Sequence, residues 1–169
     1  MKTGFLLAAA SLLFLSACAS SYQEVAMSEP GAALTIHRSE GGGLVKDAPM
    51  QNFQIVDNDQ CENVQKLAGF SFDRDYAATR RIAAGKPISF LAHSAESYTG
   101  GDLGFGPIVA FNYCWSLATF TPVDGRSYVM RHIGDPARPD SCTFVVVDET
   151  TGEAPADLEI RQQFACPDK

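Results

Sequence analysis

Histidine, the side chain that most often binds metals or transfers protons near neutral pH, occurs three times in this 169-residue chain. His37 and His132 lie in segments with a strand-like pattern, and His93 ends another such segment. A metal centre needs two or three ligands at one point, yet neither H-x-H nor H-E-x-x-H spacing occurs. The sequence therefore predicts no metal site and no cofactor.

Nucleophilic catalysis would need a serine or cysteine beside a base. His93, Ser94 and Asp102 can be combined into a Ser-His-Asp set, but the chain has no G-x-S-x-G motif to expose a strained serine. Two pairs of nearby carboxylates could divide acid and base roles: Asp57 with Asp59, and Asp73 with Asp75. Both pairs lie in polar segments, where solvated carboxylates are far more common. We expect no catalytic residues.

A glycine-rich segment at residues 97–107 carries the apolar side chains Tyr98, Leu103 and Phe105. No Lys-Ser or Lys-Thr pair follows it, so the pattern disfavours a phosphate-binding loop. A mobile hairpin tip is the commoner structure for such a segment. Exposed aromatic side chains on a loop can also form a recognition surface. We take Tyr98, Leu103 and Phe105 as the candidate binding loop.

The amino terminus has the pattern of an export signal. Lys2 precedes an apolar run over residues 5–15, which is too short to span a bilayer. The run ends in Leu15-Ser16-Ala17-Cys18, which resembles the lipobox of bacterial lipoproteins. An ordinary signal peptide followed by a coincidental cysteine is the alternative. The pattern predicts a signal peptide over residues 1–17.

The lipoprotein resemblance implies lipidation of Cys18. It implies diacylglycerol on the sulfur, cleavage before the cysteine and usually an acyl group, such as palmitate, on the new amine. Several acyl chains together anchor a protein stably, whereas one does not. Ala19 stands where an Asp would resemble an inner-membrane retention signal, so we expect the outer membrane, facing the periplasm or the surface. Residues 18–32 would be the lipidated cysteine and a flexible tether, and residues 33–169 the folded domain.

Export would place the remaining cysteines, Cys61, Cys114, Cys142 and Cys166, in an oxidising compartment. Their even number predicts two disulfides, and the C-x₂-C spacing of a zinc site is absent. A register count places Cys114 and Cys142 at one level if the intervening strand stops short or joins a facing sheet. Cys61 would then pair with Cys166. The alternative pairing is Cys142 with Cys166 and Cys61 with Cys114.

These residues must be positioned by short strands. Alternating or continuous apolar runs separated by Gly, Pro and Asp turns predict an antiparallel sandwich or barrel. We expect strands at residues 34–38, 51–56, 87–92, 108–120, 126–133, 142–148 and 158–161. A helical turn or two would fit only residues 62–67 and 73–84.

Two motifs extend this prediction. The chain reads Ala84-Gly85-Lys86-Pro87 before one strand, and Phe120, Pro122, Gly125 and Tyr128 space a turn between two others. This pattern resembles small, uncharacterised bacterial lipoproteins of immunoglobulin-like or transthyretin-like β-sandwich form. In that comparison Phe120 packs inside, and Tyr128 hydrogen-bonds back across the corner, similar to the tyrosine corner of Greek-key sandwiches. The expected fold is mainly β, a single antiparallel β-sandwich with at most a short helix.

The composition limits the function further. A formal net charge of −7 disfavours a nucleic-acid surface, which needs clustered Lys and Arg. We expect a lipid-anchored protein of the cell envelope with a non-enzymatic binding or structural role. Its partners would be the membrane, through the anchor, and another envelope protein. The alternatives are an envelope hydrolase acting on peptidoglycan or peptide, and an inhibitor of an external hydrolase.

Overall fold

The computed structural model describes residues 20–39, 50–71, 76–102, 107–135, 138–164 and 166. For strand residues 96–102, 107–111, 135, 139 and 140 it describes the backbone only. The expected signal peptide and Cys18 lie outside the described residues, as do Leu103 and Phe105.

The described residues are mainly β and contain no helix. The described part of the chain contains ten strands: β1 Ser20–Ser21, β2 Gly31–His37, β3 Met50–Val56, β4 Gln65–Phe70, β5 Ala77–Ala83, β6 Ile88–Asp102, β7 Pro107–Phe120, β8 Ser127–Asp135, β9 Arg138–Asp148 and β10 Glu159–Gln162. All seven strands expected from the sequence are present, and β6 and β9 are longer than predicted.

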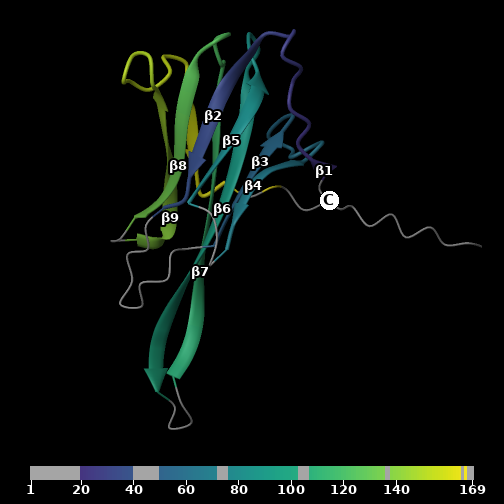
Figure 1. The fold of residues 1–169 in the computed structure, drawn as a ribbon. Helices are drawn as coiled ribbons and strands as arrows, with labels where there is room; N and C mark the ends of the chain where they lie inside the picture. The colour runs from purple at the N-terminus through teal and green to yellow at the C-terminus, as the bar shows by residue number, and fades with distance from the viewer. Residues whose placement is uncertain are drawn as a thin grey trace, which may run out of the picture.

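The strands form two sheets (Figure 1). The six-stranded sheet has the order β1-β4-β3-β6-β7-β10, and the four-stranded sheet has the order β5-β2-β8-β9. Most neighbours are antiparallel, but β1 pairs parallel with β4 and β2 pairs parallel with β8. The expectation of an antiparallel fold is therefore only partly confirmed. After β5 the chain crosses to the six-stranded sheet, where it forms β6 and β7. It then returns to the four-stranded sheet, where β8 lies beside β2.

The two segments that the sequence left open to helix are strands instead. β4 occupies part of the first segment and buries Leu67 and Phe70, while β5 occupies part of the second and buries Ile82. All seven residues of β5 pair with β2. Its Ala and Arg residues have high helix propensity, but such propensities amount to less than about 1 kcal/mol per residue, so pairing with β2 decides the structure.

One core lies between the two sheets. Leu34 and Met130 of the four-stranded sheet are buried in the same cluster as Phe53, Phe90 and Phe120 of the six-stranded sheet. The core-facing residues recur at every second position, as the pleat of a strand requires. The ring of Phe120 contacts the ring of Tyr128 across the sheets, with centroids 5.2 Å apart. Phe120 therefore packs inside, as expected.

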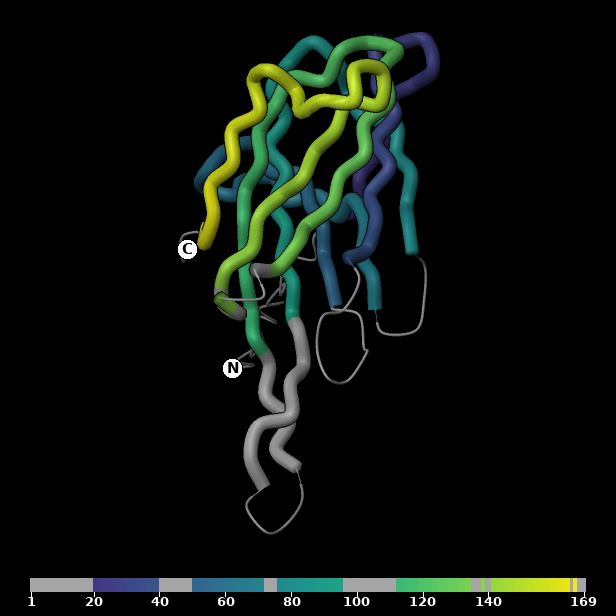
Figure 2. The backbone as a smooth tube through the Cα atoms, turned by 90° about the vertical axis from the view of Figure 1, so that its left-hand side faces the viewer, coloured from purple at the N-terminus to yellow at the C-terminus, as the bar shows by residue number. Residues whose placement is uncertain are grey.

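Several turns meet at one end of the two sheets (Figure 2). The backbone amide of Gly85 donates to the carbonyl of Pro122, and that of Gly125 donates to Gly31. Gly85 and Gly125 have φ values of 81° and 74°, a region that other residues rarely adopt. The two sequence motifs therefore shape adjoining turns, which explains why both carry a glycine.

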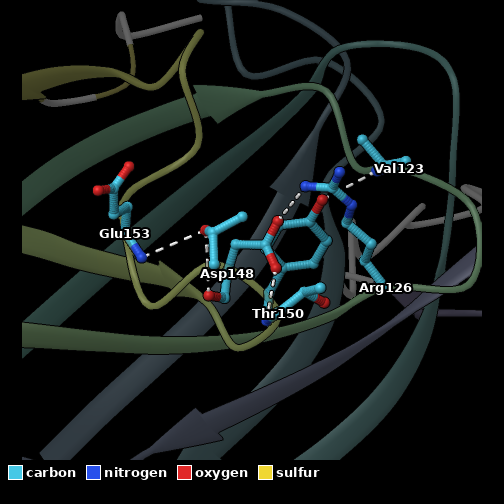
Figure 3. A network of polar contacts seen from close by, with 7 residues as sticks. Val123, Arg126, Asp148, Thr150 and Glu153 are labelled. Carbon is cyan, nitrogen blue, oxygen red and sulfur yellow. Dashed lines mark hydrogen bonds and ion pairs between the residues drawn. The ribbon is translucent and has the colours of Figure 1, made fainter.

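The corner between β7 and β8 is closed by Tyr128. Its hydroxyl oxygen accepts a hydrogen bond from the amide of Val123 at 3.0 Å, so the predicted bond across the corner is confirmed. Beside it, the buried Asp148 carboxylate accepts hydrogen bonds from the Arg126 side chain and the Thr150 amide (Figure 3). Burial raises the pKa of Asp148, but these two hydrogen bonds outweigh it and hold the pKa below its ordinary value.

The β6–β7 hairpin runs past the neighbouring strands (Figure 1). β3 pairs with β6 only from Ser89 to Ala95, and β10 pairs with β7 only from Ser116 to Thr119. The pairing of β6 with β7 continues as far as Asp102 and Pro107. Among the described strands, the outer part of this hairpin is thus a two-stranded ribbon.

Residues 20–32, the expected tether, contain contacts with the body. The amide of Tyr22 donates to the Lys66 carbonyl at 2.9 Å, and its hydroxyl donates to the Arg81 carbonyl at 3.3 Å. β2 begins at Gly31, and Ala32 is buried in the core. The ordered body therefore begins before residue 33.

Candidate functional site

The core contains a polar centre built around His132. β8 directs this side chain inward, on the same face as Tyr128 and Met130, and it is 0% exposed. Its Nδ1 lies 2.6 Å from Ser94 Oγ on β6, and its Nε2 lies 2.6 Å from Ser116 Oγ on β7. One histidine thus joins three strands of two sheets.

A glutamine completes this network. Gln51 on β3 donates through Nε2 to Ser94 Oγ at 2.8 Å and to the His132 carbonyl at 2.6 Å. Its Oε1 accepts from the Ser39 amide, and the Ser39 hydroxyl donates to the same His132 carbonyl. Buried polar groups are costly when left without partners, so the reciprocal bonds explain how the core accommodates them.

Burial determines the protonation state of His132. Desolvation, with a smaller contribution from the charge on His93, lowers the pKa of the imidazole to about 3. The ring is therefore neutral at neutral pH, with one nitrogen donating and the other accepting. A serine hydroxyl can donate or accept a hydrogen bond, so Ser94 and Ser116 can pair with the two ring nitrogens in either tautomer.

A serine beside a neutral imidazole is the arrangement used for acyl transfer. Here Ser94, Ser116 and His132 are all buried between the sheets. A substrate carbonyl would have to reach atoms that lie within the packed core. The geometry therefore provides a structural network and not an open catalytic centre.

An inter-sheet disulfide lies next to His132. Cys114 of β7 is bonded to Cys142 of β9, with Cα atoms 5.8 Å apart. The intervening strand β8 lies in the facing sheet, which is one of the two conditions under which the register count allows this pair, and β9 lies in that sheet too. The sulfur atoms and a ring nitrogen of His132 all lie within 4.8 Å of one another.

The second disulfide joins Cys61 to Cys166 across 105 residues. The preferred pairing of the four cysteines is thus confirmed, and the alternative pairing is wrong. Cys61 lies in a small cluster on the outer face of the six-stranded sheet, with Leu91, Leu117 and Phe164. The disulfide fastens the carboxy-terminal segment over that face.

Aromatic rings stack beside this cluster. The imidazole of His93 lies 4.1 Å from the Trp115 ring and 5.7 Å from the Tyr113 ring, with interplanar angles of 23° and 7°. Tyr113 is 55% exposed. Partial burial lowers the pKa of His93 below its ordinary value, so this ring too is neutral at neutral pH. We call Tyr113, His93 and Trp115 the aromatic stack.

In the Ser-His-Asp set, the side chains of Ser94 and His93 lie on opposite faces of β6. Ser94 points into the core and His93 points outward, because successive residues of a strand face opposite sides. Asp57 is exposed and accepts a hydrogen bond from Asn63, and Asp59 is exposed and forms an ion pair with Arg161. These carboxylates are solvated, as expected. Asp73 and Asp75 lie outside the described residues.

The remaining candidates lie on or near strands. The backbone of Tyr98 pairs with Ala110 within the β6–β7 ribbon, although the Tyr98 side chain is outside the described part. His37 ends β2 and is partly buried. The three histidines do not converge on one point: His93 and His132 lie on opposite faces of the six-stranded sheet.

The pairing of His132 with Ser94 and Ser116 was not predicted from the sequence. The signal was present in the alternation of the strands. Ser116 shares its side of the strand with Cys114 and Phe120, and His132 shares its side with Tyr128. Once one of these residues is known to face inward, the others must do so too.

Comparison with protein-family models and with curated proteins gives no match for this chain. Within the described part of the chain, no helix has the length and apolar character needed to cross a membrane. The function must therefore be argued from the geometry of the molecule.

Proposed function

We propose that this chain is a lipid-anchored β-sandwich protein of the bacterial cell envelope that binds another envelope protein and has no enzymatic activity. The resemblance of Leu15-Ser16-Ala17-Cys18 to a lipobox supports the anchor, and Ala19 at the following position supports an outer-membrane location. Two disulfides support an exported protein, because such bonds persist in oxidising compartments.

We also propose that the sandwich is immunoglobulin-like or transthyretin-like. An inter-sheet disulfide and a tyrosine that hydrogen-bonds across a corner are both features of immunoglobulin-like domains. The parallel pairings of β2 with β8 and of β1 with β4 make both sheets mixed, so the comparison concerns the packing of two sheets and not a strand-by-strand match.

The aromatic stack is the observation that carries the binding role. Tyr and Trp are enriched at protein interfaces because they offer a large contact area with few rotatable bonds. Here the rings are already held by stacking on His93. They lie where β6 and β7 begin to extend beyond their neighbours, so a partner that contacts Tyr113 can also reach the ribbon that carries Tyr98.

A hydrolase receives less support. Its best serine-histidine pairs, Ser94 and Ser116 with His132, are buried between the sheets. The described carboxylate pair, Asp57 and Asp59, is solvated and bonded to neighbouring polar side chains. None of these groups has both the access and the perturbed environment of a general acid or base.

Site-specific photocrosslinking in intact envelopes tests the binding role. A benzophenone amino acid at position 113 is expected to form a crosslinked product of defined mass. The matched control is position 76, since Tyr76 is 84% exposed and lies before β5 in the other sheet. Equal crosslinking at both positions, or none at position 113, would contradict the proposal.

A further inference from the structure

Three metal-binding side chains meet inside the core. Cys114 comes from β7, His132 from β8 and Cys142 from β9, and all three are buried. Their ligand atoms lie within 4.8 Å of one another. In the oxidised protein the two sulfurs are bonded to each other, so neither is available as a thiolate.

We propose that reduction of this disulfide converts Cys114, Cys142 and His132 into a binding site for one monovalent copper ion. Thiolate sulfur is a soft ligand that selects Cu(I), and imidazole also binds copper. Structural zinc sites almost always have four ligands. The described residues offer three sulfur or nitrogen ligands here, and all three residues are buried, so the donor set favours a metal that accepts three ligands.

The chemistry balances with an external dithiol as reductant. The dithiol transfers two electrons and two protons to the Cys114–Cys142 bond, which breaks to give two thiols, and the dithiol itself becomes a disulfide. Binding of Cu(I) then displaces one proton from each thiol to solvent. No electron moves in that second step, so copper remains monovalent.

The serine network supports the orientation of His132. Each ring nitrogen has a serine partner, Ser94 on one side and Ser116 on the other. When one nitrogen binds copper, the other keeps its hydroxyl partner, and such hydrogen bonds fix the ring orientation of metal-binding histidines. The serines are therefore positioning residues for this site.

The second disulfide provides an internal comparison. Cys61 and Cys166 form the other pair, on the outer face of the six-stranded sheet. Among the described residues, they belong to no group of three metal ligands. Reduction should thus create a copper site at one pair and only free thiols at the other. This inference does not depend on the proposed partner binding.

The experiment uses the chain with Cys18→Ser, which removes the remaining thiol. Two double variants are compared with it, Cys61→Ser/Cys166→Ser and Cys114→Ser/Cys142→Ser. Each protein is reduced in denaturant and refolded without oxygen, and circular dichroism checks the strand content. Copper binding is measured as loss of absorbance from a Cu(I)–bicinchoninate complex.

We expect the reduced parent and the variant lacking Cys61 and Cys166 to remove one equivalent of copper. The oxidised parent and the variant lacking Cys114 and Cys142 should remove at least tenfold less. Equal copper uptake by both double variants would overturn the proposal, as would preferential retention of Zn²⁺ by the reduced parent.

X-ray absorption of the copper-loaded reduced parent gives a second measurement that needs no variant. The expected copper environment has two sulfur neighbours and one nitrogen neighbour. His132→Gln should replace or remove the nitrogen neighbour. A spectrum with sulfur neighbours alone in the parent would exclude His132 as a ligand and overturn the three-ligand site.

Discussion

His132 keeps both ring nitrogens hydrogen-bonded although its side chain is completely buried. The neutral ring satisfies Ser94 and Ser116, but a protonated ring would place a charge between the sheets. Charged groups are strongly disfavoured there. Protonation of His132 at low pH is therefore expected to destabilise the packed core.

The free energy of unfolding is expected to fall as the pH is lowered from about 6.5 towards 3. The pKa of His132 is about 3 in the folded chain, against about 6.5 for an unperturbed imidazole. The unfolded state binds more protons within this window, so stability decreases by about 1 kcal/mol for each pH unit. Denaturant unfolding at a series of pH values measures the slope.

His132→Gln provides the control for this slope. Between pH 6 and pH 4.5, above the ordinary pKa values of aspartate and glutamate, the variant should show a much shallower slope, to which His93, whose pKa is also lowered, still contributes. The stabilisation from ionised Asp148 is lost at lower pH, as its depressed pKa is approached. A parent protein with flat stability from pH 6 to pH 4.5 would disprove the neutral, buried state of His132.

At the level of elements, the sequence predicts the strands that combine alternation with β-branched or aromatic residues, such as β3 and β7. It does not predict β4 and β5. β5 reads Ala-Ala-Thr-Arg-Arg-Ile-Ala, with no regular alternation of apolar and polar residues, and its structure depends on pairing with β2, whose residues lie forty or more positions earlier in the chain. Local propensity cannot contain that information.

The same limit applies to the polar centre. The sequence favours pairing Cys114 with Cys142 because the expected turns bring both residues to one level, but it does not determine that the two strands lie in different sheets. The contact between Ser94 and His132 requires knowing which strands of the two sheets face each other. That relation follows from the crossover of the chain between sheets and not from any spacing within the sequence.

The β7–β8 corner gives a prediction at this scale. Tyr128→Phe removes the oxygen that accepts from the Val123 amide and leaves the buried ring in place. Loss of a partly buried hydrogen bond should lower the free energy of unfolding by about 1 kcal/mol. Denaturant unfolding measures the change, and Tyr76→Phe, at a strongly exposed tyrosine, should change it by less than about 0.5 kcal/mol.

At the scale of the whole molecule, the Cys61–Cys166 disulfide joins residues 105 positions apart. A crosslink that closes so long a loop restricts the unfolded chain, and its removal typically costs about 2–4 kcal/mol. The structure adds a local effect, because the same bond holds Phe164 over the outer face where Trp115 lies.

Replacing Cys61 and Cys166 by alanine should therefore expose Trp115 while leaving the inter-sheet core folded. Trp115 is the only tryptophan of the chain, so intrinsic fluorescence reports on this face directly. We expect a red shift of the emission maximum without loss of the circular-dichroism signal of the strands. An unchanged emission maximum in the double variant would show that Phe164 stays packed over the face of Trp115 without the disulfide.

The position of β2 affects how an incomplete chain behaves. β2 can pair with β5 early in synthesis. Its other edge stays unpaired until β8 is synthesised, because Ala33 of β2 pairs with Ser127 of β8. Contacts between residues so distant in sequence form late, and an unpaired strand edge is a template for wrong partners. A nascent chain that stops short of β8 would thus carry an open, apolar strand, so this sheet is vulnerable to aggregation until β8 has been synthesised.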